Sequence, residues 1–358
     1  MTKVLISGIC GFAGSSIAHG LLDESSAFEV SGVDNLSRPG SQVNVEPLRT
    51  RGVKLFHGDV RSVSDLELIP CFDWLIDAAA NPSVLAGVSD DSTSRQVFET
   101  NLYGTINLLE LAKKFRAGFL LLSTSRVYSA RQLSGLPMKV EHDSFRLDLS
   151  AALPNGVTAE GVNEQFSTEA PRSLYGSSKL ASEIIALEYG EVFEMPVWIN
   201  RCGVLAGAGQ FGRPDQGIFS FWINAYLRRK ALRYIGFGGG GYQVRDCLHP
   251  KDLVPVLHKQ MLDCGNGHPR MLNFGGGNEN SMSLLGLSEW CAQQFGRHEV
   301  KSDKTNRCFD VPWLILNSGL AERTWSWRPA TKLEAILDQI ARHADAHPEW
   351  LRLSGVYS

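Results

Sequence analysis

Lys3-Val-Leu-Ile-Ser7 leads directly into Gly8-Ile-Cys-Gly11-Phe-Ala-Gly14, and a helix-compatible stretch follows from Ser15 to Asp23. The first run is β-rich, so the predicted order is strand, tight glycine turn and helix. This context turns a glycine pattern into a dinucleotide-binding fingerprint. The spacing alone is equally compatible with ordinary strand-to-helix punctuation. The position of the turn and the sequence that follows it favour the fingerprint.

Each glycine of this turn has its own predicted task. Gly8 would supply the turn, Gly11 would let the backbone approach a pyrophosphate, and Gly14 would let helix and strand pack closely. The helix N-terminus offers N–H groups and a positive dipole end to the phosphates. Phe12 and Ala13, which lie in this turn just before the helix, are therefore also expected to contact the cofactor.

A second predicted strand, Phe28–Val33, ends on Asp34, which Asn35 follows. A carboxylate about 20 residues after the last glycine is suited to bind a ribose diol and to repel a 2′-phosphate, so NAD is favoured over NADP. Arg38 could accommodate such a phosphate, but the surface preference of arginine favours a solvated loop charge. Asp34 and Asn35 are expected cofactor contacts.

A third predicted strand, Val53–Phe56, precedes Gly58-Asp59-Val60. Asp59 and Val60 have the place and residue types to flank an adenine ring, while Asp59 is also suited to be a helix N-cap. These assignments are not exclusive.

Short β-rich runs alternate with helical stretches from Met1 to about Leu122, including a strand at Trp74–Ala78 and a helix at Val97–Phe115. Such alternation predicts a parallel, doubly wound sheet. Within the helix, Asn101 would either hold backbone near an active site or satisfy a buried polar group, and the second role is slightly favoured.

Gly118-Phe-Leu-Leu-Leu-Ser-Thr-Ser125 is the apolar run expected of a strand buried on both faces of a parallel sheet. It ends in hydroxyls, and open α/β sheets bind ligands at the carboxyl ends of their strands. Thr124 is therefore a candidate to hydrogen-bond a reacting oxygen. The alternative is a threonine that caps the strand end.

Tyr175 and Lys179 lie four residues apart in Leu174-Tyr-Gly-Ser-Ser-Lys-Leu180, so a helix would place both on one face. A neighbouring ammonium favours the phenolate of a tyrosine, which could then take a proton from a sugar hydroxyl. Tyr-x-x-x-Lys also occurs by chance in many helices. The glycine turn, Asp34 and Thr124 make the catalytic interpretation stronger.

Composition excludes several classes of protein. The 358 residues have a formal net charge of −3 and no basic stripe, which argues against a nucleic-acid partner. The first strand begins almost at Met1, and no apolar run approaches the ~18 residues of a bilayer span, so a cytoplasmic enzyme without a membrane partner is expected. The seven cysteines show no disulfide framework or metal-ligand spacing, so reduced thiols and no metal are expected.

The chain divides by composition near residue 207. Residues 1–207 are expected to form the NAD-binding Rossmann domain, with residues 129–172 as an irregular, Pro- and Gly-rich insertion that flanks the substrate pocket. Residues 208–358 are expected to form mainly a smaller substrate-binding lobe, interleaved with the first domain. The fold class is α/β, a Rossmann-type doubly wound parallel sheet with a smaller C-terminal lobe.

With these motifs in order, the chain resembles the extended short-chain dehydrogenase/reductase superfamily, the nucleotide-sugar epimerases and dehydratases. Further agreeing motifs are Asp77-Ala-Ala-Ala80, Asn101-x-x-Gly104-Thr-x-Asn107, Gln243-Val-Arg-Asp246 and Asn273-Phe-Gly-Gly-Gly277. The resemblance implies bound NAD and a nucleotide-diphosphate sugar as substrate. The residues that it implies for the site are Thr124, Tyr175 and Lys179 for catalysis, Tyr175, Lys179, Ala78, Ala79, Ala80 and Asn101 at the cofactor, and Thr124, Gln216, Arg245 and Arg307 at the substrate.

Within the superfamily, 4,6-dehydratases have an Asp-Glu pair after the threonine, where this chain has Ser125-Arg126. Dehydration is therefore disfavoured. Several loop motifs are similar to the branch of CDP-paratose 2-epimerases, also called CDP-tyvelose epimerases. One departure is Val204, which stands where many relatives have an asparagine that binds diphosphate.

The resemblance implies transient oxidation at a ring carbon, C2 if the branch is correct, and return of hydride to the opposite face. A UDP-hexose 4-epimerase and an NAD(P)-dependent nucleotide-sugar reductase or dehydrogenase are the alternatives in the same superfamily. A non-catalytic sensor of NAD is disfavoured, since it needs only the cofactor half. The resemblance also implies a homo-oligomer, a dimer or tetramer, and it leaves the nucleotide base open.

Overall fold

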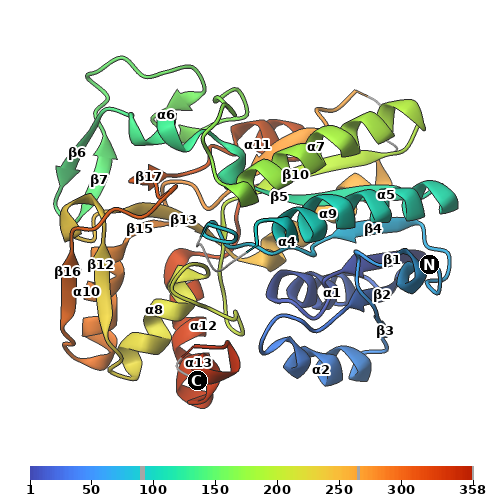
Figure 1. The fold of residues 1–358 in the computed structure, drawn as a ribbon, viewed down its shortest axis with the longest axis horizontal. Helices are drawn as coiled ribbons and strands as arrows, with labels where there is room; N and C mark the ends of the chain where they lie inside the picture. Colours follow the sequence, from blue (N-terminus) through green and yellow to red (C-terminus); the bar gives the residue numbers. More distant parts are fainter. Residues whose placement is uncertain (89–92, 264–266, 357–358) are drawn as a thin grey trace.

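A parallel sheet of seven strands forms the centre of the larger lobe, in the order β14-β10-β5-β4-β1-β2-β3. The computed structural model describes residues 1–88, 93–263 and 267–356 (Figure 1). The strands are β1 (Thr2–Ser7), β2 (Phe28–Asp34), β3 (Lys54–His57), β4 (Trp74–Asp77), β5 (Gly118–Thr124), β10 (Val197–Cys202) and β14 (Met271–Phe274). The predicted Rossmann-type α/β fold is confirmed.

The strand order reverses between β1 and β4, because β2 and β3 extend the sheet on one side and β4, β5, β10 and β14 on the other. Ligands bind in open α/β sheets at such a switch point, outside the carboxyl ends of the strands. Every residue of β5 is buried, as the apolar run Gly118–Thr124 requires of a strand covered on both faces.

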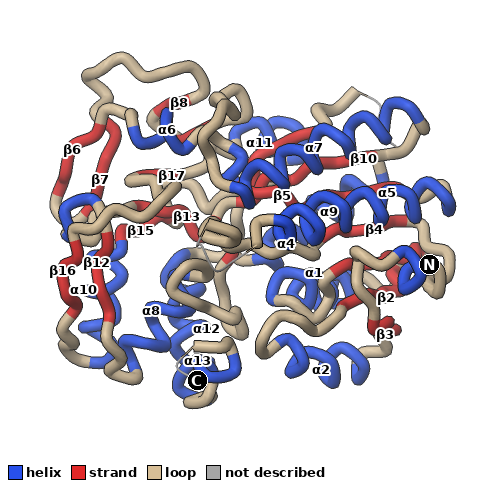
Figure 2. Tube along the Cα trace, viewed as in Figure 1, coloured by secondary structure: helices blue, strands red, loops and turns tan. Residues whose placement is uncertain are grey.

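Helices cover both faces of this sheet (Figure 2). One apolar cluster lies beneath α1 (Phe12–Glu24), α9 (Val254–Leu262) and α11 (Gly319–Trp325), and a second lies beneath α5 (Gly104–Phe115) and α7 (Leu174–Val192). The helix predicted at Val97–Phe115 begins earlier, as α4 (Arg95–Phe98), and includes a π-helical turn at Glu99–Tyr103 before α5. Shorter helices are α2 (Val45–Thr50) and α3 (Val63–Leu66).

The smaller lobe packs around its own apolar cluster. Its strands are β11 (Val204–Leu205), β13 (Val244–Leu248), β15 (Ser281–Ser283) and β17 (Trp313–Leu314) in one sheet, and β12 (Leu232–Ile235) with β16 (Val300–Asp303) in another. Its helices are α8 (Ile218–Leu227), α10 (Leu284–Phe295), α12 (Leu333–Ala346) and α13 (Trp350–Leu353). The chain crosses between lobes more than once, since α9, β14 and α11 return to the large sheet.

The segment 129–172 is more regular than predicted. It forms α6 (Ala130–Ser134) and two antiparallel hairpins, β6 (Met138–Glu141) with β7 (Ser144–Leu147), and β8 (Val157–Thr158) with β9 (Gly161–Val162). Its apolar residues pack in one cluster with residues 311–316. None of its residues lines the main cavity, and its position beside the substrate pocket stays a prediction.

No helix in the described part of the chain is long and apolar enough to cross a membrane.

Candidate active site

A cavity of about 670 Å³ lies between the carboxyl edge of the large sheet and the smaller lobe. The predicted residues that line it are Gly8, Gly11, Phe12, Ala13, Gly14, Asp34, Asn35, Val60, Ala78, Ala79, Ala80, Thr124, Tyr175, Gln216, Arg245 and Arg307. Asp59, Asn101 and Lys179 are not part of its lining. The structure thus brings most of the residues predicted for the cofactor and for the substrate together around one continuous cavity.

The glycine turn after β1 is too tight for side chains. Gly8 has φ 62°, and a Cβ on Gly14 would lie 2.4 Å from the Gly8 carbonyl oxygen. Gly11 directly precedes α1, and its backbone N–H donates to the Gly8 carbonyl at 3.0 Å. Because α1 begins at this turn, its first N–H groups and the positive end of its dipole face the cavity, as phosphate binding requires.

Asp34, at the end of β2, is held by backbone donors. Its Oδ2 accepts from the Cys10 N–H at 2.9 Å and its Oδ1 from the Leu36 N–H at 2.8 Å. Burial raises the pKa of this carboxyl, and the backbone hydrogen bonds counteract that effect. The carboxylate therefore has a fixed orientation where a ribose diol is expected.

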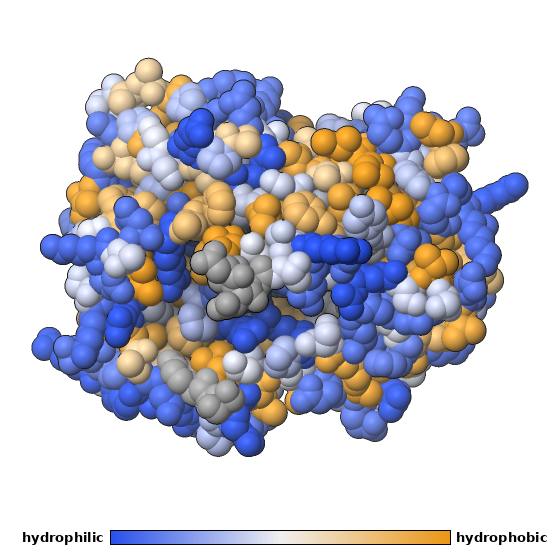
Figure 3. All heavy atoms as spheres, viewed as in Figure 1, coloured by the Kyte–Doolittle hydropathy of each residue, from blue (hydrophilic) through white to orange (hydrophobic). Residues whose placement is uncertain are grey.

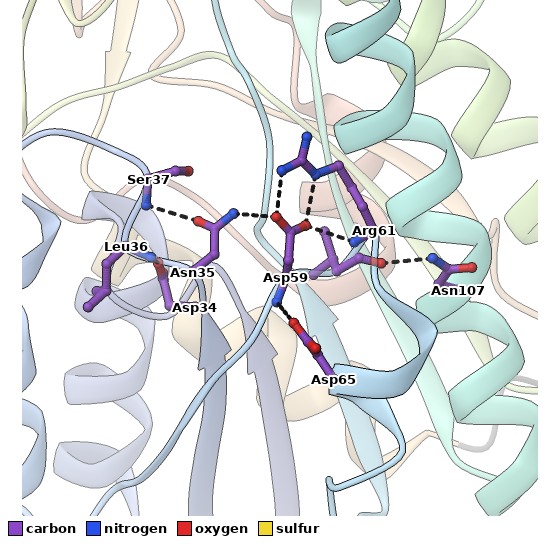
Figure 4. A network of polar contacts seen from close by, with 9 residues as sticks. Asp34, Asn35, Leu36, Ser37, Asp59, Arg61, Asp65 and Asn107 are labelled. Atoms are coloured by element: carbon purple, nitrogen blue, oxygen red, sulfur yellow. Dashed lines mark hydrogen bonds and ion pairs between the residues drawn. The ribbon is translucent and has the colours of Figure 1, made fainter.

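Asn35 and Asp59 form a second polar group beside the first (Figure 4). Asn35 Nδ2 donates to Asp59 Oδ2 at 2.9 Å, and Arg61 pairs with the same carboxylate at 2.6 Å. The hydrogen bonds from Arg61 lower the pKa of Asp59 to about 2. Asp59 precedes α3, whose N-cap is Ser62, so the predicted N-cap role of Asp59 is wrong. The aspartate instead fixes Asn35 and Arg61, both of which line the cavity.

Arg38 does not behave as the solvated loop charge that the sequence favoured. Its side chain is partly buried, and its guanidinium donates to the Phe211 carbonyl. In the amide orientation that satisfies both partners, Gln216 also accepts from this guanidinium. Burial lowers the pKa of Arg38 to about 10. Arg38 therefore links the cofactor half to the smaller lobe, and Gln216 lines the cavity while bonded to Arg38.

The backbone that follows β4 is held in place by hydrogen bonds to buried side chains. Ser7 Oγ donates to Asp77 Oδ1 at 2.7 Å and accepts from the Ala78 and Ala79 N–H groups at 3.1 Å. Asn101 is fully buried. Its amide oxygen accepts from the Asn81 N–H, and its amide nitrogen donates to the Asn81 carbonyl and to Ser178 Oγ of α7. Asn101 thus satisfies a buried position and also ties the cofactor-side loop to α7.

Tyr175 and Thr124 meet at the middle of the cavity. Thr124 ends β5, and its hydroxyl hydrogen-bonds the phenol of Tyr175 in the first turn of α7. This helix can approach the strand end because residue 176 is glycine, where a Cβ would lie 2.2 Å from the Arg126 carbonyl oxygen. Burial raises the pKa of Tyr175, while the hydrogen bond with Thr124 and the charge of Arg126 lower it.

Lys179 lies one helical turn beyond Tyr175 and is 2% exposed. Burial lowers its pKa, and the nearby carboxylates of Asp77 and Glu183 act in the opposite direction. Glu183 in turn forms a buried ion pair with Arg201, whose Nη2 lies 2.6 Å from Glu183 Oε2. Lys179 is therefore a buried side chain with two carboxylates nearby, and it does not belong to the lining of the cavity.

The substrate-side predictions lie at the opposite end. Arg245 of β13 is paired with Asp310 at 2.7 Å, and burial lowers the pKa of Arg245 to about 10. Arg307 lines the cavity, and its guanidinium donates to the Pro214 carbonyl at 3.2 Å. Val204, the apolar departure from the asparagine of relatives, also lines it.

Arg126 is a residue of this site that the sequence motifs did not predict. Arg126 lines the cavity directly beside Thr124, and its backbone N–H donates to Thr124 Oγ1 at 3.2 Å. In the sequence, Arg126 differs from the dehydratases only as one of two positions that lack a carboxylate. The signal that could have identified it is a cation two residues after a candidate catalytic hydroxyl at the end of a central strand.

The cavity has a binding turn for a dinucleotide at one end and arginines at the other, with a buried phenol between them. This arrangement is typical of an enzyme in which a bound nucleotide cofactor reacts with the substrate. The residues fit NAD in particular, because the turn before α1 leaves space that a Cβ would fill and Asp34 stands where it would repel a 2′-phosphate.

The chain belongs to the NAD dependent epimerase/dehydratase family, whose model matches residues 4–275. The resemblance to the extended short-chain dehydrogenases and the prediction of NAD as cofactor are thereby confirmed. This protein is therefore an enzyme of the family of nucleotide-sugar epimerases and dehydratases. Its relatives that are named epimerases are isomerases.

A CDP-paratose 2-epimerase of Salmonella typhi is 28% identical over an alignment of 301 residues, which covers 80% of this chain and 82% of that protein. A UDP-glucuronate 4-epimerase of Thermodesulfobacterium geofontis is 25% identical and covers 93% of both chains. A similar solved structure is that of a UDP-glucuronic acid 4-epimerase mutant from Bacillus cereus, in complex with a fluorinated UDP-sugar and NAD. The match has a TM-score of 0.78 and 22% sequence identity, and it covers 96% of this chain and 99% of that chain. That structural likeness supports the fold.

The described cysteines, all except residue 264, are free thiols. Among the described residues, no group of three His, Cys, Asp or Glu side chains is placed to hold a metal ion.

Proposed function

We propose that the protein is a nucleotide-sugar epimerase that inverts a ring carbon by transient oxidation, and that its substrate pair is CDP-paratose and CDP-tyvelose. The observation that carries the epimerase assignment is the pair of Thr124 and Tyr175, which line the cavity together with Ser125 and Arg126. No carboxylate stands at those two positions, so water elimination lacks the acid and base that the dehydratases use. The narrower assignment rests on the CDP-paratose 2-epimerase relative and the shared loop motifs.

Several groups of the chain would hold the substrate and cofactor. The turn Gly8–Gly14 and the N-terminus of α1 would bind the NAD pyrophosphate, and Asp34 the adenosine ribose. Arg245 and Arg307 would hold the diphosphate of the sugar nucleotide. This anchor lies away from the reacting carbon, so the sugar can rotate and present its opposite face while the nucleotide stays bound.

Bound NAD would accept a hydride from the sugar carbon and return it to the opposite face of the ring. Tyr175, as phenolate, would take the proton of the hydroxyl on that carbon and later give it back. Thr124 would hydrogen-bond the same oxygen. Lys179, buried one turn away, would contact the nicotinamide ribose and favour the phenolate by its charge. No net redox change results.

A 4-epimerase of UDP-hexuronic acids is the second candidate. The observation that favours it is coverage, since the UDP-glucuronate 4-epimerase relative matches 93% of this chain and the CDP-paratose 2-epimerase relative 80%. Both candidates use the same oxidation and differ in the ring carbon and in the sugar.

The experiment is to incubate the purified protein separately with CDP-paratose, CDP-tyvelose, CDP-glucose, UDP-glucose and UDP-glucuronate. The inverted carbon is then assigned by proton NMR of each product. We expect interconversion of CDP-paratose and CDP-tyvelose at C2. Inversion at C4 of a UDP-sugar alone would replace this assignment by the second candidate, and release of a 4-keto-6-deoxy sugar would overturn both.

We also propose that the protein forms a homodimer through α5 and α7. Apolar side chains gather on the surface over α7 (Figure 3). The exposed ones on this part of the protein are Tyr103 (59%), Ile184 (56%), Val192 (65%) and Phe193 (44%). An exposed apolar patch of this kind marks an interaction site, and burying it against a second copy removes it from water. Sedimentation of the wild type and of Ile184→Asp tests this, with dissociation of the variant expected.

A further inference from the structure

Arg126 stands between the two parts of the site that the proposed reaction needs to bring together. It is the middle residue of the short turn Ser125–Val127 that follows β5. Its backbone N–H donates to Thr124 Oγ1 at 3.2 Å, and its carbonyl lies against Gly176, next to Tyr175. The backbone of Arg126 is therefore fixed from both sides by the elements that carry Thr124 and Tyr175.

The guanidinium of Arg126 has few partners within the protein. Among the described residues, its side-chain hydrogen bond is a long one, from Nη1 to the Phe309 carbonyl at 3.5 Å. A guanidinium has more N–H donors than this contact uses, and they lie in one rigid plane suited to a planar or tetrahedral oxyanion. Since Arg126 lines the cavity, donors are available to a ligand there.

Among the residues that the structure describes, the charges around Arg126 do not balance. The carboxylate of Asp310 acts on it, but that carboxylate is directly bonded to Arg245 at 2.7 Å. Two guanidinium groups thus share one carboxylate at this part of the cavity. A buried or half-buried cation without its own counter-ion is costly, and an anionic ligand removes that cost.

We propose that Arg126 is a substrate-binding residue whose guanidinium binds an oxyanion of the substrate close to the reacting ring carbon. The inference rests on the proposed function for the place of the sugar. Two sources supply such an oxyanion: the phosphate bonded to the sugar, or a carboxylate on the sugar ring. The same cation also stabilises the phenolate of Tyr175, because its charge lowers the pKa of that phenol.

The test measures binding and does not need turnover. Protein loaded with NAD is titrated by calorimetry with CMP, CDP, CDP-glucose, UMP, UDP, UDP-glucose and UDP-glucuronate. Wild type is compared with Arg126→Gln, which removes the charge, and with Arg126→Lys, which keeps it. Arg328→Gln is the matched control, because Arg328 is an exposed arginine paired with Glu322 on the surface.

We expect Arg126→Gln to weaken binding about tenfold or more for the ligands that carry the oxyanion, since charge-assisted hydrogen bonds are the strong ones. Arg126→Lys is expected to recover part of this loss. If the sugar-linked phosphate is the source, CDP, UDP and their sugars all bind more weakly while CMP and UMP do not. If a sugar carboxylate is the source, the loss is confined to UDP-glucuronate.

The proposal is overturned if Arg126→Gln binds every ligand within about twofold of the wild type while retaining NAD and a wild-type melting temperature. If Arg126→Gln does not fold, Arg126→Lys is compared with the wild type instead. Lysine lacks the bidentate geometry of arginine, so equal affinities of the two proteins for nucleotide diphosphates and for UDP-glucuronate would overturn the proposal. A protein that binds these nucleotides through Arg126 but inverts no sugar would contradict the proposed function and leave this inference standing. Wild-type protein that binds none of them would overturn both.

Discussion

Nη2 of Arg245 lies 2.7 Å from Oδ1 of Asp310 at the substrate end of the cavity. The same guanidinium donates to the carbonyls of Val244 at 2.7 Å and Val311 at 2.6 Å. Its orientation is therefore set by the protein before any substrate binds. An anchor held in this way loses little entropy on binding, which is the advantage of preorganisation.

Arg245→Lys tests this anchor. A lysine is a point charge that cannot keep the carbonyl and carboxylate contacts together, so diphosphate binding weakens while the reacting carbon is unaffected. We expect KM to rise about tenfold with kcat changed less than about twofold, the signature of uniform binding. The control is Arg328→Lys, on the surface. A lower kcat at unchanged KM would contradict the anchoring role.

Tyr175→Phe tests the proposed proton acceptor. Removal of the phenolic hydroxyl should lower kcat about a thousandfold, within the range of general acid–base catalysis, without loss of bound NAD. The matched control is Tyr128→Phe, because Tyr128 is also a buried phenol and donates to Asn273 Oδ1 at 2.8 Å. That variant should lose about 1 kcal/mol of stability and keep its kcat. Steady-state rates and urea denaturation separate the two effects.

The pH dependence of the reaction follows from the same phenol. Burial raises the pKa of Tyr175, so the phenolate is the minor form at neutral pH. An acid with a raised pKa gains its active, deprotonated form as pH increases, and kcat/KM should rise about tenfold per pH unit between about pH 6 and 9. Arg126→Gln should move this limb to higher pH, because the charge that lowers the pKa is removed. A flat profile in the wild type would contradict the phenolate role.

Gly14→Ala tests the cofactor cradle. The added methyl group would lie 2.4 Å from the Gly8 carbonyl oxygen, so the turn must open. We expect protein that purifies without NAD and melts at a lower temperature. Gly135→Ala is the control, because that residue has φ −92° and the nearest atom to an added Cβ lies 3.5 Å away. Retention of NAD by Gly14→Ala would contradict the claim that NAD binding requires the close packing of this turn.

The strands β1 to β5 of the large sheet could be predicted from the sequence to within about a residue, mainly because buried parallel strands are short apolar runs. The glycine turn could be predicted for a related reason. At Gly14, backbone atoms of Gly8 and Ile9 exclude any side chain, and such a constraint is visible in the sequence as glycine.

Contacts between segments far apart in the chain could not be predicted. Arg38 is buried by Phe211, which lies 173 residues away, so its own loop sequence gives no sign of its burial. The hairpins within residues 129–172 are too short for a periodic pattern, and they are stabilised by packing against residues 311–316. The role of Arg126 could not be predicted, because it depends on the pairing of Asp310 with Arg245.

The measurement that tests the central claim most directly is turnover in deuterated water without added cofactor. The substrate is whichever nucleotide sugar the protein inverts, and NAD released by denaturing the protein is identified by mass. The account predicts stoichiometric NAD and an inverted sugar with no deuterium at the inverted carbon, because the hydride that leaves the ring also returns to it. Deuterium at that carbon, or turnover only with added NADPH, would contradict it.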